Sequence, residues 1–315
     1  MTCGTMRRRD GSIWASHNRS LERREYVLNG FINLIVNGLA TGMLVFLLAS
    51  GLTLIFGLMS VLNFAHGGLF AWGAYTGVWL YAATGSFVLA IVGAILAGML
   101  LGFLMERIVI RPVYGNHVQQ ILVTLGVMLV LSELLKVVFG PNPLKADAPP
   151  LLSGSWEVQG IIFIKYRLFI IVVGALVYGG LLFILKRTKI GLIVRAGVMN
   201  PEMVQALGIP IRRVFTLVFM VGAGLAALGG VLLAPYSGVI FAEMGMQFAI
   251  LAFIVVVIGG MGSIQGSALA ALLVGLSGAF MAYYVPDLSL AGNMLLMVIV
   301  LLIKPSGLFG AKGGT

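Results

Sequence analysis

The chain is dominated by long stretches without a single charged residue. Tyr26 to Met105 contains no Asp, Glu, Lys or Arg, and the same holds for Val214 to Ala242, Met244 to Pro286 and Leu288 to Ile303. A helix needs about 20 apolar residues to cross a hydrocarbon core of about 30 Å. The pattern therefore predicts an all-α, polytopic integral membrane protein.

Nine candidate spans can be placed on this pattern, and one of them contains an interruption. Residues 57–68 include Asn63, His66 and three glycines, which suits a broken or re-entrant helix buried within protein. If this segment is not a full crossing, eight crossings remain and both termini lie inside. The alternatives are an extra turn-back within Phe31 to Gly57 or an amino terminus outside. We expect about eight to ten transmembrane helices with one or two interrupted segments. The candidate spans are about 28–57, 61–82, 87–106, 119–139, 167–186, 214–234, 247–262, 266–284 and 288–303.

Charged residues make up only 10% of the chain, against about 25% in soluble proteins, and the basic ones indicate its orientation. Short basic segments at Arg107 to His117 and Lys186 to Arg213 should face the cytoplasm by the positive-inside rule. The loop Gly140 to Tyr166 carries four prolines and should be external. The formal charge of +10 does not indicate nucleic-acid binding, because the positive residues are scattered between apolar runs.

A single membrane domain is expected between the polar segments at the two ends of the chain. Residues 1–26 carry six Arg and few bulky apolar residues, which predicts a basic, disordered cytosolic arm. The transmembrane domain should occupy residues 27–310, with a loop at 186–213, and residues 311–315 should form a cytosolic tail.

Motifs for chemistry are missing from the sequence. It contains no G-x-x-x-x-G-K-[ST] phosphate loop, no His/Cys/Asp cluster suited to a metal and no nucleophile beside a plausible base. These gaps argue against an enzyme, and in particular against a chain that hydrolyses ATP itself.

The loop Arg195 to Pro210 has the local chemistry of a short helix. Asn200 suits the N-cap, Pro201 suits the first helical position and Glu202 complements the positive end of the helix dipole. Gly208 supplies the left-handed residue that ends the helix. Such a short helix is marginal alone, so Met203, Leu207 and Ile209 should pack on a partner or on neighbouring spans. The alternative is an ordinary capped connector.

Five motifs occur in order along the chain: Asn63-Phe64-Ala65-His66-Gly67, Glu106-Arg107 with Arg111-Pro112-Val113, Arg195-Ala196 with Leu207-Gly208-Ile209, Gly259-Gly260-Met261-Gly262-Ser263-Ile264, and Lys304-Pro305 with Gly307-Leu308. Together they resemble the permease subunits of bacterial ABC importers of the branched-chain amino-acid type. The resemblance runs from about residue 29 to 310 and is closer to the LivH-like subunit than to the LivM-like one. Two departures stand out: Gly68 occupies a position where the family often has an acid, and residues 1–26 have no counterpart.

The resemblance implies a permease subunit in the bacterial inner membrane that binds no cofactor of its own. Its expected partners are a LivM-like second permease, two cytosolic ATPase subunits that use ATP, and an extracytoplasmic solute-binding protein. It implies coupling to the ATPases through Arg195, Ala196, Asn200, Pro201, Glu202, Met203, Leu207, Gly208 and Ile209. It also implies a translocation pathway near Asn63, Phe64, His66, Gly67, Gly259, Gly260, Gly262 and Ser263.

The resemblance leaves alternatives for the solute. Branched-chain or other apolar amino acids are favoured, and urea or short amides, or aromatic and other organic acids, are the alternatives. A self-contained secondary transporter or channel is the rival class. It would require intramembrane carboxylates for a driving ion, and outside the Glu133 and Lys136 pair the sequence offers none at mid-membrane depth.

The polar residues within the candidate spans and at their ends have simple structural explanations. His66 is expected to be neutral and hydrogen-bonded rather than a proton relay, because no carboxylate lies near it in sequence. Glu133 and Lys136, three residues apart, should form an ion pair. Glu106 and Arg107 should anchor an inner membrane end. The glycines at 222, 224, 229 and 230 should allow close helix approach.

Overall fold

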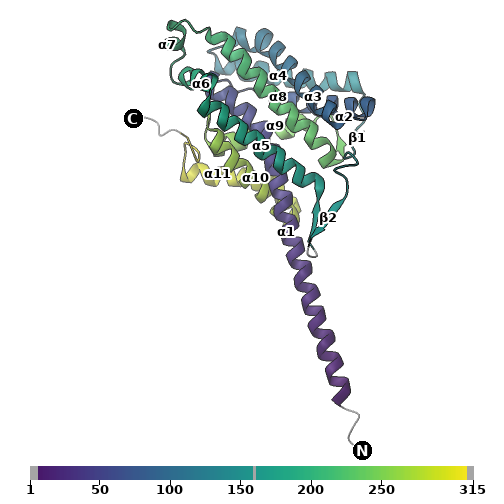
Figure 1. Ribbon diagram of the computed structural model, residues 1–315. Coiled ribbons are helices and arrows are strands. Elements are labelled where there is room, and N and C mark those ends of the chain that lie inside the picture. The colour runs from purple at the N-terminus through teal and green to yellow at the C-terminus, as the bar shows by residue number, and fades with distance from the viewer. Residues whose placement is uncertain (1–5, 159–160, 311–315) are drawn as a thin grey trace, which may run out of the picture.

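The computed structural model describes residues 6–158 and 161–310, and it is almost entirely helical (Figure 1). Short strands pair at one end of the helix bundle. A π-helical turn (Glu106–Ile110) and 3₁₀ turns (Arg111–Val113 and Pro286–Leu288) complete the order. The helices are α1 (Met6–Met59), α2 (His66–Thr84), α3 (Phe87–Met105), α4 (His117–Phe139), α5 (Lys165–Arg187), α6 (Lys189–Met199), α7 (Pro201–Ala206), α8 (Ile211–Ser237), α9 (Met244–Gly259), α10 (Ile264–Tyr284) and α11 (Ser289–Ile303).

The helices confirm the predicted polytopic membrane fold. Within the described residues, six helical stretches are long and apolar enough to cross a bilayer, and α9 and Ala291–Ile303 are apolar but shorter. With α2, they correspond to the nine predicted stretches. The six long stretches are Asn29–Met59, Phe87–Val113, His117–Phe139, Lys165–Arg187, Ile211–Ser237 and Ile264–Tyr284.

Helix α1 runs antiparallel to α8. Near the end of α8, Tyr236 donates a hydrogen bond to Asn37 and pairs with the hydroxyl of Thr41 at 2.8 Å. Near the other end, Leu58 packs with Val218 at the start of α8 and with Val194 on α6. The early part of α1 therefore lies at the opposite end of the bundle from α6 and α7.

This direction corrects the predicted topology. Residues 6–26 and the loop 186–213 lie at opposite ends of the bundle, so they cannot both be cytosolic, and eight crossings with both termini inside is wrong. The alternative with the amino terminus on the other side of the membrane fits. We call the end that carries Arg107–His117 and Lys186–Arg213 the basic end.

The arm also differs from the predicted disorder. Helix α1 begins at Met6 and projects beyond the bundle as one continuous helix (Figure 1). Residues 6–26 contain no proline, so the helix of the first span can extend through them without losing a hydrogen bond. The remaining residues 1–5, and the predicted tail at 311–315, lie outside the described residues.

The predicted interruption is present between α1 and α2. Helix α1 ends at Met59, Ser60 takes a positive φ of 51°, and the next regular helix starts only at His66. The Nε2 atom of His66 donates to the carbonyl of Leu48 at 3.1 Å. Because Leu48 lies eleven residues before the end of α1, or about 16 Å along the helix, the chain has turned back into the bundle before α2 begins.

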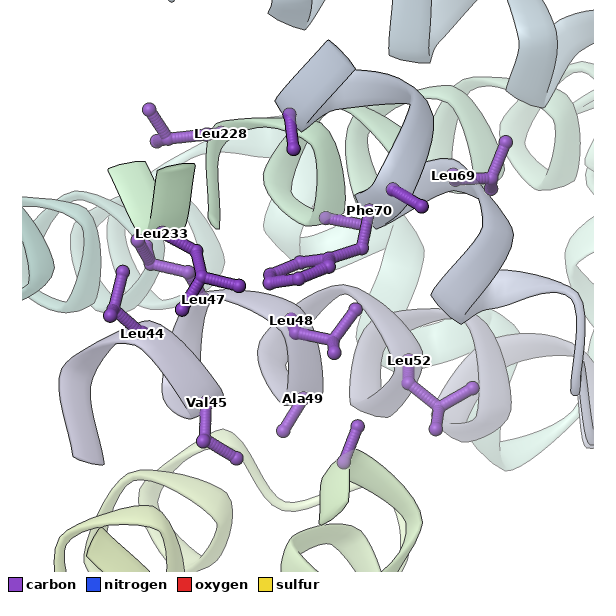
Figure 2. Packing of buried hydrophobic residues seen from close by; sticks show 14 of the residues in the cluster. Leu44, Val45, Leu47, Leu48, Ala49, Leu52, Leu69, Phe70, Leu228 and Leu233 are labelled. Carbon is purple, nitrogen blue, oxygen red and sulfur yellow. The ribbon is translucent and has the colours of Figure 1, made fainter. Parts of the chain in front are cut away.

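Close contacts between glycines and neighbouring backbones hold the core together. Figure 2 shows Phe70 of α2 among leucines of α1 and α8, where its side chain is fully buried. A Cβ at Gly230 would lie 1.9 Å from the carbonyl oxygen of Phe70, and one at Gly266 would lie 1.9 Å from that of Gly259. Only glycine lets these helices approach so closely, as the sequence predicted.

Among the described residues, two pairs of short strands and an ion-pair cluster lie at the end opposite the basic end. Strand β1 (Leu144–Lys145) pairs with β4 (Val239–Ile240), and β2 (Ser155–Val158) pairs with β3 (Ile161–Ile164), all antiparallel. Lys136 contacts Glu133 at 2.9 Å, as predicted, and also Glu243 at 2.7 Å. The hydrogen bond from Lys136 holds the pKa of the Glu243 carboxyl below its usual value.

The direction of α1 gives a testable topology. In a Cys3→Ser background, Leu151→Cys and Ser16→Cys should react in intact cells with a membrane-impermeant thiol reagent, whereas Gln205→Cys should not. The basic end should face the cytoplasm, because Lys and Arg concentrate in cytoplasmic loops. Labelling of Gln205→Cys would reverse the orientation, and protection of Ser16→Cys together with Gln205→Cys would contradict the antiparallel path of α1.

Candidate functional site

The loop between α5 and α8 folds into two capped helices. The Asn200 side chain accepts the N–H of Met203 at 2.9 Å, and Pro201 is the first residue of α7, as the sequence predicted. Gly208 has a φ of 83° and ends the helix in the predicted left-handed conformation. Ile209 continues the turn by donating its N–H to the carbonyl of Val204 at 3.3 Å.

Helix α6 was not predicted from the sequence. Thr188 caps it by accepting the N–H of Gly191 at 3.1 Å, and the helix then runs to Met199. The sequence does carry a signal: a threonine precedes apolar residues at Ile190, Ile193 and Val194, the spacing of a helix face. That signal is hard to separate from the long α5 pattern, because α5 ends only two residues earlier.

One side of this loop anchors it to the bundle. Val194 packs with Leu58 and Val218, and Val204 is buried. A Cβ at Gly197 would meet the tips of the Leu58 and Ile211 side chains at 3.0 and 3.1 Å. The loop therefore sits against the ends of α1 and α8, so that a displacement of α6 or α7 would be transmitted to both spans.

The other side of the loop presents apolar side chains at the surface. Met199 is 88% exposed, Leu207 73% and Met203 59%. Arg195, Asn200 and Glu202 are also exposed, whereas Ala196 and Ile209 are half-buried. We call the exposed apolar set the coupling surface; it consists of Leu192, Val198, Met199, Met203 and Leu207.

The Asn63 to Gly67 segment forms a buried polar site at membrane depth. Asn63 Oδ1 accepts the N–H of Ala65 at 3.1 Å, and Phe64 donates its N–H to Thr124 on α4 at 3.3 Å. Asn63 Nδ2 and His66 Nδ1 are buried without a hydrogen-bond partner. Because His66 Nε2 donates to Leu48, its Nδ1 in the neutral ring is an acceptor, which complements the Asn63 donor.

Asn63 and His66 also line a small cavity whose other lining residues are apolar. Its volume is about 10 Å³, close to the space needed for one water molecule. Gly67 also lines the cavity, and a Cβ there would lie 2.0 Å from the carbonyl oxygen of Gly245. The remaining lining comes from Leu52, Leu62, Phe64, Ala249, Ala252 and Phe253.

The Gly259 to Ser263 segment, predicted to line the same pathway, does not line this cavity. Gly259 ends α9, Gly260 and Gly262 have φ values of 96° and 84°, and Ser263 caps α10 by accepting the N–H of Gly266. The turn lies toward the basic end, where a Cβ at Gly57 would approach Gly262 at 3.0 Å.

The segment after α11 docks on this turn. Leu308 donates its N–H to the carbonyl of Ile258 at 2.8 Å, and Phe309 donates to Gly259 at 2.9 Å. Gly307, with a φ of 77°, fits against Gly260, where a Cβ would lie 2.6 Å from the Cα. Two of the sequence motifs therefore meet in space and brace the inner ends of α9 and α10.

A buried carboxylate joins the other basic loop to α8. Glu106 is fully buried and accepts hydrogen bonds from the Tyr114 hydroxyl at 2.6 Å and the Thr216 hydroxyl at 2.9 Å. Burial, together with the bond to Glu106, raises the pKa of Tyr114 well above its usual value, so its hydroxyl remains a donor. The sequence placed Glu106 at a membrane end but gave no sign of its partner on α8, 110 residues away.

The family model described as branched-chain amino acid transport system / permease component matches residues 34–303. The chain belongs to this permease family. The matched region includes the coupling surface, the Asn63 to Gly67 site and every helix from the apolar part of α1 to the end of α11.

Two members of the permease family, both from high-affinity branched-chain amino acid systems, align along nearly their whole length. The chain is 31% identical to the permease protein BraD of a high-affinity branched-chain amino acid transport system from Pseudomonas aeruginosa, over 89% of this chain and 96% of that protein. It is 29% identical to LivH from Escherichia coli K12, with the same coverage. Against LivM of that organism it is 31% identical, covering 84% of this chain but 68% of LivM. Coverage thus agrees with the LivH-like assignment.

A variant of His66 tests the structural interpretation of this residue in the permease. Among the residues that the structure describes, those lining its cavity carry no charge, so none of them is placed to exchange a proton with His66. We expect His66→Gln to keep the parent's profile of uptake against pH between about pH 5 and 8, where a titrating histidine would show itself. His66→Leu should reduce the amount of folded permease, because a buried hydrogen bond contributes about 1 kcal/mol. A shifted pH profile in His66→Gln would indicate a proton relay.

Proposed function

We propose that this chain is the LivH-type permease subunit of an ABC importer for branched-chain or other apolar amino acids. The observation that carries the proposal is the family match over residues 34–303. A second, LivM-type permease would pair with it in the bacterial inner membrane, two cytosolic ATPases would supply the energy from ATP, and an extracytoplasmic binding protein would deliver the solute.

The coupling surface supports the assignment of the ATPase contact. Met203 and Leu207 stand out on a loop that is rigidly capped and that packs on α1 and α8. Apolar anchors on a short helix suit insertion into a groove of a partner. Movement of the ATPase would then shift the adjoining ends of α1 and α8, and both helices contribute side chains to the core in Figure 2.

Reconstitution tests the proposed function. Proteoliposomes containing this chain, its second permease and both ATPases should accumulate leucine only when ATP is present on the ATPase side and the binding protein on the other. Omission of either component should reduce uptake to background. Uptake driven by a proton or sodium gradient without ATP would instead establish a secondary transporter.

The membrane site predicts weak solute binding by the permease pair alone. A zwitterion held at mid-bilayer needs partners for both charges, and the cavity at Asn63 and His66 offers only neutral groups in a space of about 10 Å³. Calorimetry on the purified pair without binding protein should show no affinity for leucine tighter than about 1 μM, equivalent to about −8 kcal/mol. Submicromolar binding would require a specific intramembrane site and would contradict selection by the external protein.

A further inference from the structure

A cavity lined by arginines lies at the basic end of the bundle, between the turns that follow α3 and the start of α8. Its volume is about 460 Å³. Arg107 and Arg111 come from the π-helical and 3₁₀ turns, and Arg212 and Arg213 come from the first turn of α8. Two segments more than 100 residues apart in sequence therefore place four arginine residues around one space.

None of these arginines has a carboxylate partner within the part of the chain that the structure describes. Both ion pairs found there involve Lys136, at the opposite end of the bundle. Glu106 is adjacent in sequence, but it is buried and accepts hydrogen bonds from Tyr114 and Thr216. Four like charges around a cavity repel one another, so an anion would stabilise the arrangement. Guanidinium groups bind phosphate oxygens in pairs of parallel hydrogen bonds.

Apolar side chains line the part of the cavity that lies away from the basic end. Phe103 on α3 and Leu217 and Met220 on α8 line it, and the Arg107 guanidinium lies 5.8 Å from the centre of the Phe103 ring. From Arg212 to Met220 the helix rises by about 12 Å, so the cavity extends from the basic end into membrane depth. An occupant that fills it must be anionic at one end and apolar at the other.

The outer face of α3 continues the apolar wall. Leu96, Leu100 and Leu104 are exposed at intervals of four residues and form a row along the helix. A row of this kind suits contact with hydrocarbon chains. Neither a free phosphate ion nor an acidic segment of a protein partner would use it, although either could satisfy the arginines.

We propose that this cavity binds the phosphate headgroup of an anionic phospholipid, whose acyl chains lie against α3 and α8. Basic pockets between transmembrane helices at the cytoplasmic side are suited to such lipids. The bound lipid would join the loop after α3 to the first turn of α8, which directly follows the coupling helix α7.

The test uses the assembled transporter, extracted with its partner subunits in mild detergent and delipidated. Native mass spectrometry would follow titration with phosphatidylglycerol, phosphatidylcholine or inorganic phosphate. In Arg107→Gln/Arg212→Gln, phosphatidylglycerol should bind roughly thirtyfold more weakly, since each cation near an anionic lipid contributes about fivefold. The control Lys186→Gln/Arg187→Gln removes the same charge at the same end outside the cavity and should bind like the parent.

Several results would overturn the proposal. Equal binding of phosphatidylglycerol and phosphatidylcholine, or equal loss in both double variants, would show no headgroup site in the cavity. Displacement of phosphatidylglycerol by an equal concentration of inorganic phosphate would show a free-anion site. Protection of Arg107 and Arg212 from an arginine reagent by the ATPases in the lipid-free complex would assign the cavity to a protein partner. If the variant does not assemble, the headgroup comparison on the parent complex decides.

Discussion

Gly230→Ala should abolish most folded permease. Its Cβ would lie 1.9 Å from the carbonyl oxygen of Phe70 and 2.9 Å from the N–H nitrogen of Ala74, and both are backbone atoms that cannot move without displacing α2 from α8. Overpacking of a core costs about 1–3 kcal/mol when side chains can adjust, and here they cannot. Size-exclusion chromatography of detergent extracts after heating should show the loss directly.

Two other glycine-to-alanine variants serve as controls. They show whether the loss of folded protein comes from the steric clash or from replacing any helical glycine. Gly229→Ala, next along α8, would meet the edge of the Phe70 ring at 3.2 Å, which a small ring shift can relieve, so a smaller loss is expected. Gly179→Ala on α5 meets nothing within 4 Å and should match the parent or exceed it, because alanine favours helix by about 1 kcal/mol over glycine. Equal stability of Gly230→Ala and Gly179→Ala would refute the close contact.

Although the sequence left the number of crossings between eight and ten, the positions and helical type of the apolar segments could be predicted from it because charge-free length is a local property. The same holds for the capped α7, where Asn200 and Gly208 act within four residues of their partners. The direction of α1 could not be predicted in this way. It depends on contacts such as Tyr236 with Asn37, which join positions 199 residues apart, whereas the positive charge of the arm argued for the same side as the basic loops.

In the candidate site, too, local features could be predicted from the sequence and long-range contacts could not. The sequence identified Asn63 and His66 as polar residues at membrane depth, and the structure places both beside one cavity. The resemblance also placed Gly259 to Ser263 on that pathway; the structure brings this turn against the segment at Leu308, and its part in the pathway stays a prediction. Glycine-rich motifs cannot distinguish a pathway wall from a packing contact, because both need a backbone without side chains.

Leu207→Asp should uncouple the transporter while leaving the permease folded. The side chain is 73% exposed, so the change removes no packing within the chain. If Leu207 fills a groove of the ATPase, a buried carboxylate there is strongly unfavourable, and central interface residues contribute about 2 kcal/mol or more. ATP hydrolysis stimulated by loaded binding protein, and leucine uptake, should fall together by tenfold or more in proteoliposomes, a change of about 1.4 kcal/mol or greater.

Gln205→Asp is the matched control for that variant. It puts the same charge on an exposed position of the same short helix, where a polar side chain already stands, and it should retain coupled uptake. A second pair of variants, Gly208→Val and Gly208→Asn, tests the conformation of the loop. Gly208 has a φ of 83°, and a Cβ there would meet nothing within 4 Å, so a side chain at this position acts only through backbone strain. That strain is about 1–2 kcal/mol for valine, and asparagine largely avoids it. Coupling should therefore fall in Leu207→Asp and Gly208→Val and persist in Gln205→Asp and Gly208→Asn. Normal coupling in both Leu207→Asp and Gly208→Val would mean that the ATPases engage a different surface of this chain.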